Sequence, residues 1–285
     1  MKKVLVTGAT GFIGTAVIEE LLRKGYAVIA SSSNMNKAVS KDWFDKVTYI
    51  EFDLKLFNSN LDYFDFFQQP DLLIHLAWEG LPNYTNEFHV NENLPRHASF
   101  LKNMLVNGLT DLTVTGTCFE YGMQEGCLSE TMECHPANAY AIAKNELRKQ
   151  LELLSSTVNF NFKWARLFYM YGRGQNPKSL ISQLDKALEQ NEPVFNMSGG
   201  EQVRDFLPIE KVAAYIVAIA AQTAVTGIIN CCSGKPVTVK EFVENYLNEK
   251  NKGIRLNLGY YPYTDYEAMK FWGDNTKLKL ILSND

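Results

Sequence analysis

A glycine-rich segment, Thr7-Gly8-Ala9-Thr10-Gly11-Phe12-Ile13-Gly14, directly follows the apolar run Val4-Leu5-Val6. This order predicts a strand that ends in a tight turn and opens a helix. A pyrophosphate can approach such a turn and accept hydrogen bonds from the free N–H groups at the positive end of the helix. The spacing Gly-x-x-Gly-x-x-Gly shares this mechanism with the general dinucleotide fingerprint but differs from it in sequence. The segment predicts a nucleotide-binding turn, with a turn that binds no ligand as the alternative.

Tyr140 and Lys144 lie four residues apart in a segment predicted to be helical. This spacing puts both side chains on one face of the helix. A phenol has a pKa of roughly 10, and a nearby ammonium favours the phenolate. Tyr140 would then exchange a proton with a substrate oxygen near neutral pH. The alternative is a half-buried tyrosine beside a lysine whose stem covers apolar surface.

A third motif, Val114-Thr115-Gly116-Thr117-Cys118-Phe119-Glu120-Tyr121-Gly122, ends a predicted strand. Carboxyl ends of parallel strands meet at one edge of a sheet, so this motif is expected beside the glycine turn. A hydroxyl from Thr117 could there bind a reacting oxygen, although threonine at a strand end also serves as a strand former or cap.

The elements that must position these motifs form an alternating pattern of short apolar runs and longer amphipathic segments. Strands are predicted over residues 3–7, 26–30, 47–52, 72–76, 112–115, 162–166 and 227–230. Helices are predicted over residues 14–24, 94–107, 137–155, 178–191 and 210–223. The pattern predicts an α/β fold of Rossmann type, a doubly wound parallel sheet whose ligands bind at the carboxyl ends of its strands.

Two segments, residues 169–205 and 235–285, are richer in Pro, Gly, Asn and Tyr and interrupt this alternation. We assign them to a smaller, C-terminal substrate-binding lobe. Residues 1–168 would form the dinucleotide-binding domain, to which residues 206–234 return.

Composition restricts the kind of protein. The 285 residues are 46% hydrophobic and 21% charged, as in a globular chain with a large core. A net charge of −4 without a basic cluster argues against nucleic acid as a partner. Five cysteines at spacings unlike those of metal sites predict reduced thiols and no metal centre. Glycines interrupt the apolar run after Met1-Lys2-Lys3, and no stretch is long enough to span a bilayer. We therefore expect a cytoplasmic protein with no membrane partner.

Taken together and in this order, the three motifs resemble those of the extended short-chain dehydrogenase/reductase family, in particular its nucleotide-sugar branch. Family-like stretches continue along nearly the whole chain, at residues 53–54, 75–77, 166–168, 171–172, 204–206, 230 and 233–234.

The resemblance implies roles for the positions that match. The cofactor-binding residues would be Gly8, Thr10, Gly11, Phe12, Ile13, Gly14, Ser32, Ser33, Asp53, Leu54, Leu76, Ala77, Tyr140, Lys144 and Phe168. The substrate-binding residues would be Trp78, Thr117, Cys118, Tyr140, Tyr169 and Arg204. The catalytic residues would be Thr117, Tyr140 and Lys144.

Within this set, the glycines would cradle the pyrophosphate, residues 53–54 would border the adenine, and residues 76–77 would lie under the dinucleotide. Lys144 would hold the nicotinamide ribose and lower the pKa of Tyr140. Arg204 would pair with the substrate diphosphate, for which a guanidinium is suited. The alternative for Arg204 is a surface salt bridge with a carboxylate such as Asp205.

Departures from the family pattern narrow the reaction. Members that dehydrate C4 and C6 carry Asp-Glu after the catalytic threonine, where this chain has Cys118 and Phe119. Members that epimerise C3 and C5 use a cysteine two residues after the catalytic hydroxyl and a later histidine, but no histidine follows His135. Both activities are disfavoured, and Cys118 is expected to be a small buried thiol.

Cofactor choice depends on the end of the second predicted strand, where an acidic residue normally binds the ribose 2′-OH of NAD. Ser32 aligns with that acid, and no carboxylate appears until Asp42. Hydroxyls at Ser32 and Ser33, together with Lys37, are suited to a 2′-phosphate. This predicts NADP(H) in preference to NAD(H), with a plain polar turn as the alternative.

The resulting expectation is NADPH-dependent reduction, at C4, of a dTDP-linked 4-keto-6-deoxyhexose to a sugar such as 6-deoxytalose or fucose, for surface polysaccharide. Residues 168–172 and 196–202 carry the resemblance to dTDP-6-deoxyhexose 4-dehydrogenases, although Tyr169 replaces an asparagine that many relatives use on the sugar. The alternatives are a nucleotide-sugar C4 epimerase with tightly bound NAD and a non-catalytic NADP-binding member of the fold. A homodimer through the helices at 94–107 and 137–155 is expected from the relatives.

Overall fold

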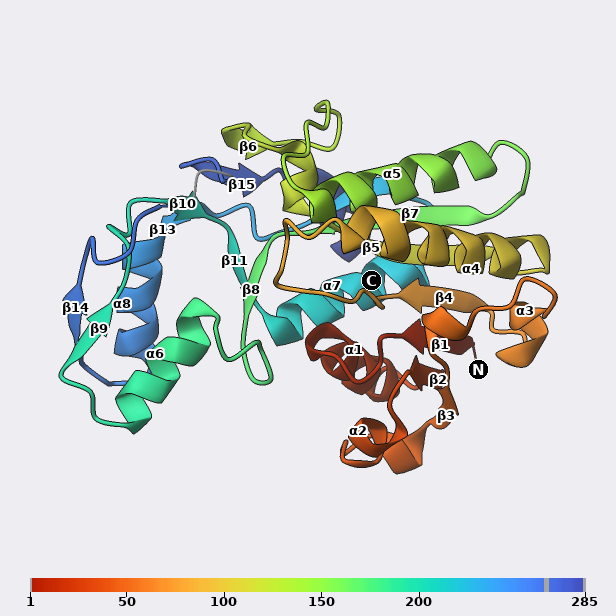
Figure 1. Cartoon of the computed structure of the whole chain (residues 1–285), viewed down its shortest axis with the longest axis horizontal. Helices are drawn as coiled ribbons and strands as arrows, with labels where there is room; N and C mark the ends of the chain where they lie inside the picture. Colours follow the sequence, from red (N-terminus) through yellow and green to blue (C-terminus); the bar gives the residue numbers. More distant parts are fainter. Residues whose placement is uncertain (1, 264–266, 284–285) are drawn as a thin grey trace.

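The computed structural model describes residues 2–263 and 267–283, and a seven-stranded parallel sheet lies at its centre (Figure 1). The strands lie in the order β12-β7-β5-β4-β1-β2-β3. The chain adds β2 and β3 on one side of β1 and the later strands on the other side, so the strand order reverses between β1 and β4. Their bounds are β1 (Lys3–Thr7), β2 (Ala27–Ser32), β3 (Thr48–Glu51), β4 (Leu72–His75), β5 (Asp111–Thr117), β7 (Asn161–Leu167) and β12 (Gly227–Cys231). All seven predicted strands and the Rossmann-type fold class are confirmed.

Helices cover both faces of this sheet. Successive side chains of a strand point to opposite faces, so Val4 and Val6 enter one core while Leu5 enters the other. The first core is covered by α1 (Phe12–Arg23), α7 (Ile209–Ala221) and α9 (Thr276–Leu282). The second is covered by α3 (Tyr63–Phe66), α4 (Leu94–Val106) and α5 (Ala139–Leu154). Burial on both faces explains why the strands are apolar without alternation.

The helix predictions agree with the structure except at the ends. The first helix, predicted from residue 14, begins two residues earlier in the structure, at Phe12. Gly11 before it has the extended backbone of an N-cap. The periodic pattern did not reveal the short helix α2 (Met35–Val39), α3, α9 or α8 (Val239–Glu249).

The lobe lies at one end of the molecule (Figure 1). Its apolar cluster combines α6 (Leu180–Glu189), α8 and β9 (Val194–Asn196), with the rings of Phe206 and Phe242 stacked at 3.9 Å. Paired short strands are β9 with β14 (Arg255–Asn257), β10 (Val203–Arg204) with β13 (Val237–Thr238), β11 (Phe206–Pro208) with β8 (Tyr169–Tyr171), and β15 (Phe271–Gly273) with β6 (Gly126–Leu128).

The division into two domains stays a prediction. One part of the segment assigned to the lobe lies elsewhere, since α9 packs Leu278 and Ile281 into the core of the central sheet. By packing into this core the two apolar side chains are removed from water, and α9 lies against α7 and β12.

Across residues 2–263 and 267–283, no helix is long and apolar enough to cross a membrane. The same described residues contain no group of three or more His, Cys, Asp or Glu side chains placed to hold a metal ion.

Candidate active site

The turn after β1 fits closely against the segment that follows β4. Gly8 has a φ of +71°, and a Cβ at this position would lie 2.7 Å from the backbone nitrogen of Ala77. The amide of Gly11 donates to the carbonyl of Gly8 at 3.0 Å and closes the turn. Only glycine fits at position 8, because both the conformation and the close backbone contact exclude a side chain. The turn lies where the strand order reverses, which is where such sheets bind ligands.

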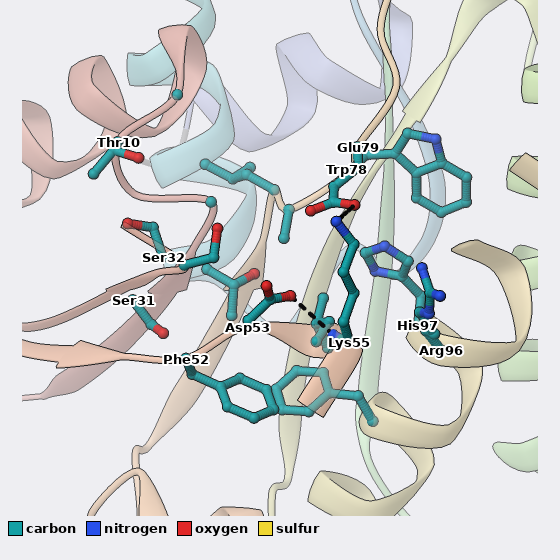
Figure 2. A pocket seen from close by; sticks show the side chains of 18 of the residues that line it. Thr10, Ser31, Ser32, Phe52, Asp53, Lys55, Trp78, Glu79, Arg96 and His97 are labelled. Atoms are coloured by element: carbon teal, nitrogen blue, oxygen red, sulfur yellow. Dashed lines mark hydrogen bonds and ion pairs between the residues drawn. The ribbon is translucent and has the colours of Figure 1, made fainter. Parts of the chain in front are cut away.

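A cavity of about 230 Å³ opens beside this turn (Figure 2). Ten predicted residues line it, namely Gly8, Thr10, Gly11, Ser32, Ser33, Asp53, Leu54, Leu76, Ala77 and Trp78. The predicted cofactor residues outside this lining are Phe12, Ile13, Gly14, Tyr140, Lys144 and Phe168. Trp78, predicted on the substrate side, therefore lies at this cavity. The glycine cradle and a lining drawn from the ends of β1 and β2 and from the segments after β3 and β4 fit a dinucleotide.

Sequence reasoning missed several residues of this lining. They are Phe52, Lys55, Glu79, Asn93, Arg96, His97 and Phe100. Lys55 and Glu79 form an ion pair of 2.9 Å that links the segment after β3 to the segment after β4 (Figure 2). No local pattern could reveal this pair, because it depends on how two loops from separate strands meet.

Two buried histidines extend from the glycine turn toward the cavity. Thr7 Oγ1 lies 2.8 Å from His75 Nδ1, and His75 Nε2 lies 2.7 Å from His97 Nδ1. Burial lowers the pKa of His75 to about 3 and also lowers the pKa of His97, so both rings are neutral near pH 7. The histidines are 22 residues apart in sequence, and only the folded sheet and α4 bring them into contact.

The end of β2 has a polar arrangement that was not anticipated. The hydroxyl of Ser32 lies 2.9 Å from the hydroxyl of Tyr49. Glu51, the register partner of Ser32 on β3, accepts a hydrogen bond of 2.8 Å from the amide of Met35. A carboxylate therefore does lie near the end of β2, although it comes from the neighbouring strand. Lys37 lines the cavity at the same end.

Thr117 and Tyr140 meet at the carboxyl edge of β5. Asn138 caps α5 by accepting from the amide of Ala141 at 2.9 Å, which sets Tyr140 in the first turn. The side chain of Thr117 lies close enough to Tyr140 to act on the pKa of its phenol, which it lowers against the larger effect of burial. Three other aromatic rings surround it, those of Trp78, Tyr84 and His89, at centroid distances of 6.0, 5.6 and 5.4 Å. The two predicted catalytic hydroxyls are thus together in a mostly apolar enclosure.

Lys144 is buried one turn further along α5. Its ammonium donates to the carbonyl of Thr115 at 2.7 Å and lies 4.3 Å from the ring centre of Trp78. Burial lowers the pKa of Lys144 from 10.5 to about 7, while the charge of Glu120 acts in the opposite direction. Burial also raises the pKa of Tyr140. Desolvation of the phenolate is thus the largest influence on Tyr140 in this structure, and the expectation that Lys144 lowers the pKa of Tyr140 stays a prediction.

The depressed pKa of Lys144 has a measurable consequence for stability. Between about pH 7 and pH 10.5, the unfolded chain keeps a proton that the folded chain has lost at Lys144. The contribution of this group to the free energy of unfolding therefore rises with pH across that window, by at most roughly 1.4 kcal/mol per pH unit. We expect Lys144→Met to remove this slope in urea titrations of cofactor-free protein at pH 7 to 10. Equal slopes in wild type and variant would contradict the buried, deprotonated state.

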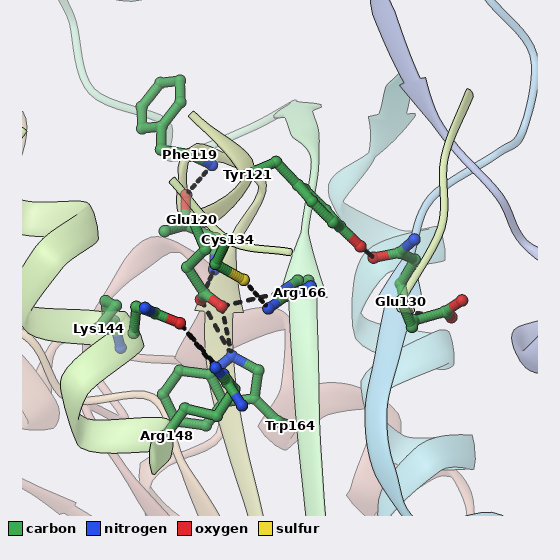
Figure 3. A network of polar contacts seen from close by, with 12 residues as sticks. Phe119, Glu120, Tyr121, Glu130, Cys134, Lys144, Arg148, Trp164 and Arg166 are labelled. Carbon is green, nitrogen blue, oxygen red and sulfur yellow. Dashed lines mark hydrogen bonds and ion pairs between the residues drawn. The ribbon is translucent and has the colours of Figure 1, made fainter. Parts of the chain in front are cut away.

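A buried ion pair supports the turn Cys118–Tyr121, which follows Thr117 (Figure 3). Glu120 and Arg166 are both 0% exposed, with Arg166 Nε 2.7 Å from Glu120 Oε2. Glu120 also accepts from the backbone amide of Thr117 at 2.8 Å and from the indole of Trp164 at 3.0 Å. The carboxylate of Glu120 therefore fixes the position of the backbone at Thr117. The resemblance gave Glu120 no role, so its importance appears only in the structure.

The substrate end contains Tyr169 and Arg204, and both are already paired. The hydroxyl of Tyr169 donates to Glu267 at 2.6 Å, and Arg204 Nη2 donates to the same oxygen at 3.0 Å. Arg204 Nη1 donates to the carbonyls of Val203 and Met269. Arg204 is 1% exposed and already paired in this structure, and its predicted contact with a substrate diphosphate stays a prediction.

The alternative, a surface salt bridge between Arg204 and a carboxylate such as Asp205, agrees with the structure in part. Arg204 does pair with a carboxylate, that of Glu267 at 3.0 Å, but the arginine is buried and its partner is not Asp205. Asp205 is buried and accepts from the amides of Ser233 and Gly234 at 2.7 and 2.8 Å. Asp205 lies between β10, which ends at Arg204, and β11, and the two charged groups have different partners. Cys118 is buried as expected, and burial raises the pKa of its thiol.

Residues 4–232 match the sequence profile of the NAD dependent epimerase/dehydratase family. The chain belongs to this family. It resembles dTDP-6-deoxy-L-talose 4-dehydrogenase (NAD(+)) of Aggregatibacter actinomycetemcomitans, with 31% identity over 95% of this chain and 98% of that protein. It also resembles UDP-glucuronate 4-epimerase of Thermodesulfobacterium geofontis, with 26% identity over 98% of this chain and 90% of the relative.

The fold agrees with this membership. The crystal structure of UDP-glucuronic acid 4-epimerase from Bacillus cereus, in complex with UDP-glucuronic acid and NAD, superposes with a TM-score of 0.83 at 21% identity. The superposition covers 99% of this chain and 93% of that one. The expected family, its nucleotide-sugar branch and its enzymatic character are confirmed, so the protein is a nicotinamide-dependent enzyme that acts on a CH–OH group of a sugar nucleotide.

Proposed function

We propose that the protein interconverts the keto and hydroxyl forms of a nucleotide-linked 6-deoxyhexose at C4, working as a 4-ketoreductase in surface-polysaccharide precursor synthesis. The observation that carries this is the position of Tyr140 and Lys144, both buried on α5 and both in contact with Trp78, which lines the cavity beside the glycine turn. Cys118 and Phe119 occupy the two positions after Thr117 where dehydrating members carry Asp-Glu, and the carboxylate of Glu120 in the same turn is buried and paired with Arg166, which disfavours a dehydration. The similarity to a dTDP-6-deoxy-L-talose 4-dehydrogenase supports dTDP and a 6-deoxy sugar.

In this mechanism the chain binds a 4-keto group between the hydroxyls of Thr117 and Tyr140. The glycine turn with Gly8 and Gly11 would hold the dinucleotide, and its reduced nicotinamide would supply the hydride for the carbonyl carbon. Tyr140, whose burial keeps its phenol protonated at neutral pH, donates its proton to the forming alkoxide. Thr117 donates a hydrogen bond to the same oxygen and orients it. Lys144, whose pKa of about 7 leaves a large fraction of the side chain protonated at neutral pH, then offers a positive charge one helical turn away to the tyrosinate that remains.

The proposed preference for NADP(H) rests on Ser33 and Lys37 more than on Ser32. The Ser32 hydroxyl is already bonded to Tyr49, whereas Lys37 lines the cavity and is exposed to solvent. Glu51 opposes a 2′-phosphate, but its carboxylate is held by the amide of Met35. We expect Lys37→Ala to lower kcat/KM for NADPH roughly fivefold, equal to about 1 kcal/mol, with less than twofold change for NADH.

The control for this prediction is Lys46→Ala, an exposed lysine that does not line the cavity. It should change neither value. A wild-type enzyme that uses NADH as efficiently as NADPH would reject the NADP(H) preference. The name of the Aggregatibacter relative gives NAD(+) as the cofactor of that protein.

A C4 epimerase with tightly bound NAD is the second candidate, favoured by the similarity to UDP-glucuronate 4-epimerases in sequence and fold. The two activities differ in what the purified protein holds and consumes. A reductase should oxidise added NADPH when given a dTDP-4-keto-6-deoxyhexose, whereas an epimerase should purify with NAD and convert its sugar without reductant. Absorbance in the reduced-nicotinamide band, followed by product analysis, distinguishes the reductase from the epimerase. A purified protein that binds NADP(H) without turning over any of these sugars would indicate a non-catalytic member of the fold.

We also propose a homodimer formed through α4 and α5, which pack together. These helices expose Val106, Ile142 and Leu153, the last at 74%. A subunit interface would remove these apolar side chains from water. Light scattering of the purified protein tests this assembly.

A further inference from the structure

One indole, that of Trp78, contacts both members of the Tyr140–Lys144 pair. The Lys144 ammonium lies 4.3 Å from the centre of the Trp78 ring, and the ring of Tyr140 lies 6.0 Å from it. Trp78 also lines the cavity beside the glycine turn, whereas Tyr140 and Lys144 do not. The side chain that borders the cavity is therefore also the one that meets the two buried groups on α5.

Hydrogen bonding and stacking fix the position of this indole. Its Nε1–H donates to His89 Nδ1 at 3.1 Å. With Nδ1 as an acceptor, His89 carries its hydrogen on Nε2 and donates to the carbonyl of Asn83 at 3.0 Å. The ring of His97 stacks on the indole at a centroid distance of 4.6 Å and is itself hydrogen-bonded to His75. The partners that set the orientation of the indole are thus themselves anchored.

The charge of Lys144 has few other sources of support. Its ammonium donates to the carbonyl of Thr115 at 2.7 Å, while burial lowers the pKa of the side chain to about 7. The charge of Glu120 acts in the opposite direction, but this carboxylate is already paired with Arg166 at 2.7 Å. A second indole, that of Trp164, is 5.9 Å from the ammonium. The charged form therefore depends on the nearer indole as well as on Glu120.

The other titratable groups around Lys144 are neutral at neutral pH. Burial lowers the pKa of His75 to about 3 and also lowers the pKa values of His97 and His89. Burial raises the pKa of Tyr140, so its phenol keeps its proton. A titration observed at Lys144 near pH 7 therefore belongs to the lysine itself.

We propose that Trp78 is a positioning residue that keeps Lys144 protonated by presenting the negative face of its indole to the ammonium. The attraction acts on the ammonium and much less on the neutral amine, so it favours retention of the proton. In a desolvated site a contact of this kind is strong enough to change a pKa by about one unit. Its consequence for turnover rests on the proposed function, in which the charge of Lys144 stabilises the tyrosinate left on Tyr140.

Fluorinated tryptophans at position 78 test this proposal with little change in the shape of the site. Fluorine withdraws electron density from the ring face and weakens its attraction for a cation, while the indole N–H remains. Monofluoro-, difluoro- and tetrafluorotryptophan are introduced at this position by stop-codon suppression, in protein whose lysines carry ¹³C at Cε. The signal of Lys144 is the one absent from Lys144→Met, and its chemical shift against pH gives the pKa in cofactor-free protein. We expect this pKa to fall with each added fluorine, by about one pH unit for the tetrafluoro ring.

The same analogues at Trp272 provide the matched control. Trp272 is partly buried like Trp78, but it lies on β15, which pairs with β6 and not with the central sheet. Fluorination there should leave the pKa of Lys144 unchanged. The monofluoro ring is the mildest change, so a tetrafluoro protein that failed to fold would still leave the trend measurable.

The pH dependence of kcat in the same variants separates this inference from the proposed function. Turnover needs the charged lysine, so the alkaline limb of kcat should move to lower pH together with the pKa of Lys144. A pKa that stays constant across the series, or that moves as much with the Trp272 analogues, would overturn the role of Trp78 and leave the proposed 4-ketoreductase intact. A pKa that falls while the alkaline limb stays in place would support the role of Trp78 and reject the charge of Lys144 as part of the proposed mechanism. If no sugar nucleotide were turned over, the proposed function would be rejected, while the titration of cofactor-free protein would still decide the role of Trp78.

Discussion

Tyr140→Phe is expected to lower turnover about a thousandfold while changing the dinucleotide affinity less than about threefold. The phenol is the only proton donor that we place at the reacting oxygen, and general acid catalysis by one side chain contributes roughly 10²- to 10⁴-fold. The ring itself remains, so its contacts with Trp78, Tyr84 and His89 are kept. The cavity for the dinucleotide does not include Tyr140 in its lining.

The measurement combines kcat with the sugar nucleotide and titration of protein fluorescence with cofactor. Tyr215→Phe provides the matched control, because it removes a partly buried tyrosine hydroxyl from α7 on the opposite face of the sheet. It should retain turnover. If the Tyr140→Phe enzyme kept more than a tenth of the wild-type rate, another group would have to be the acid and the mechanism would be wrong.

Glu120→Gln is expected to destabilise the protein by about 3–5 kcal/mol, the usual effect of breaking a buried ion pair on one side. Arg166 would keep its charge at a fully buried position without a carboxylate. The new amide would also present N–H groups where Glu120 now accepts from Thr117 and Trp164. In a chain of this size the midpoint of thermal unfolding should fall by roughly 10 °C. Because Thr117 is held through this carboxylate, kcat should fall with stability.

Two further variants separate the effect of the Glu120–Arg166 ion pair from the general effect of losing one carboxylate. Glu120→Gln with Arg166→Met removes both charges, so it should be less destabilised than either single variant. Glu146→Gln removes a carboxylate from an exposed pair with Lys149 on α5 and should change the free energy of unfolding by less than about 1 kcal/mol. A Glu120→Gln protein as stable as Glu146→Gln would show that the pair contributes little.

Much of the fold could be predicted because local patterns agree with it. The seven strands are apolar runs between turn residues, and burial on both faces requires such runs. The helices that the periodicity missed are short or mostly polar on their outer faces, such as α2 and α8. Their positions depend on the neighbours they cover, and a single window of sequence does not contain that information.

The candidate site divides in the same way. The glycine turn at residues 7–14 and the spacing of Tyr140 and Lys144 specify backbone geometry within a few residues, so the sequence by itself determined a dinucleotide turn and a helical Tyr/Lys pair. It did not determine how these groups ionise. Burial by aromatic rings from a distant loop raises the pKa of Tyr140 and lowers that of Lys144 to about 7.

Partners of charged groups were decided only by the tertiary structure. Arg204 is paired with Glu267, 63 residues away, and Ser32 has the carboxylate of Glu51 beside it from the next strand. Electrostatic partners depend on distance in space, which sequence order does not give. The sequence alone thus determined the class of enzyme and predicted the hydroxyls that we propose to act on the sugar, whereas the tertiary structure decided which charged groups pair with one another around the candidate site.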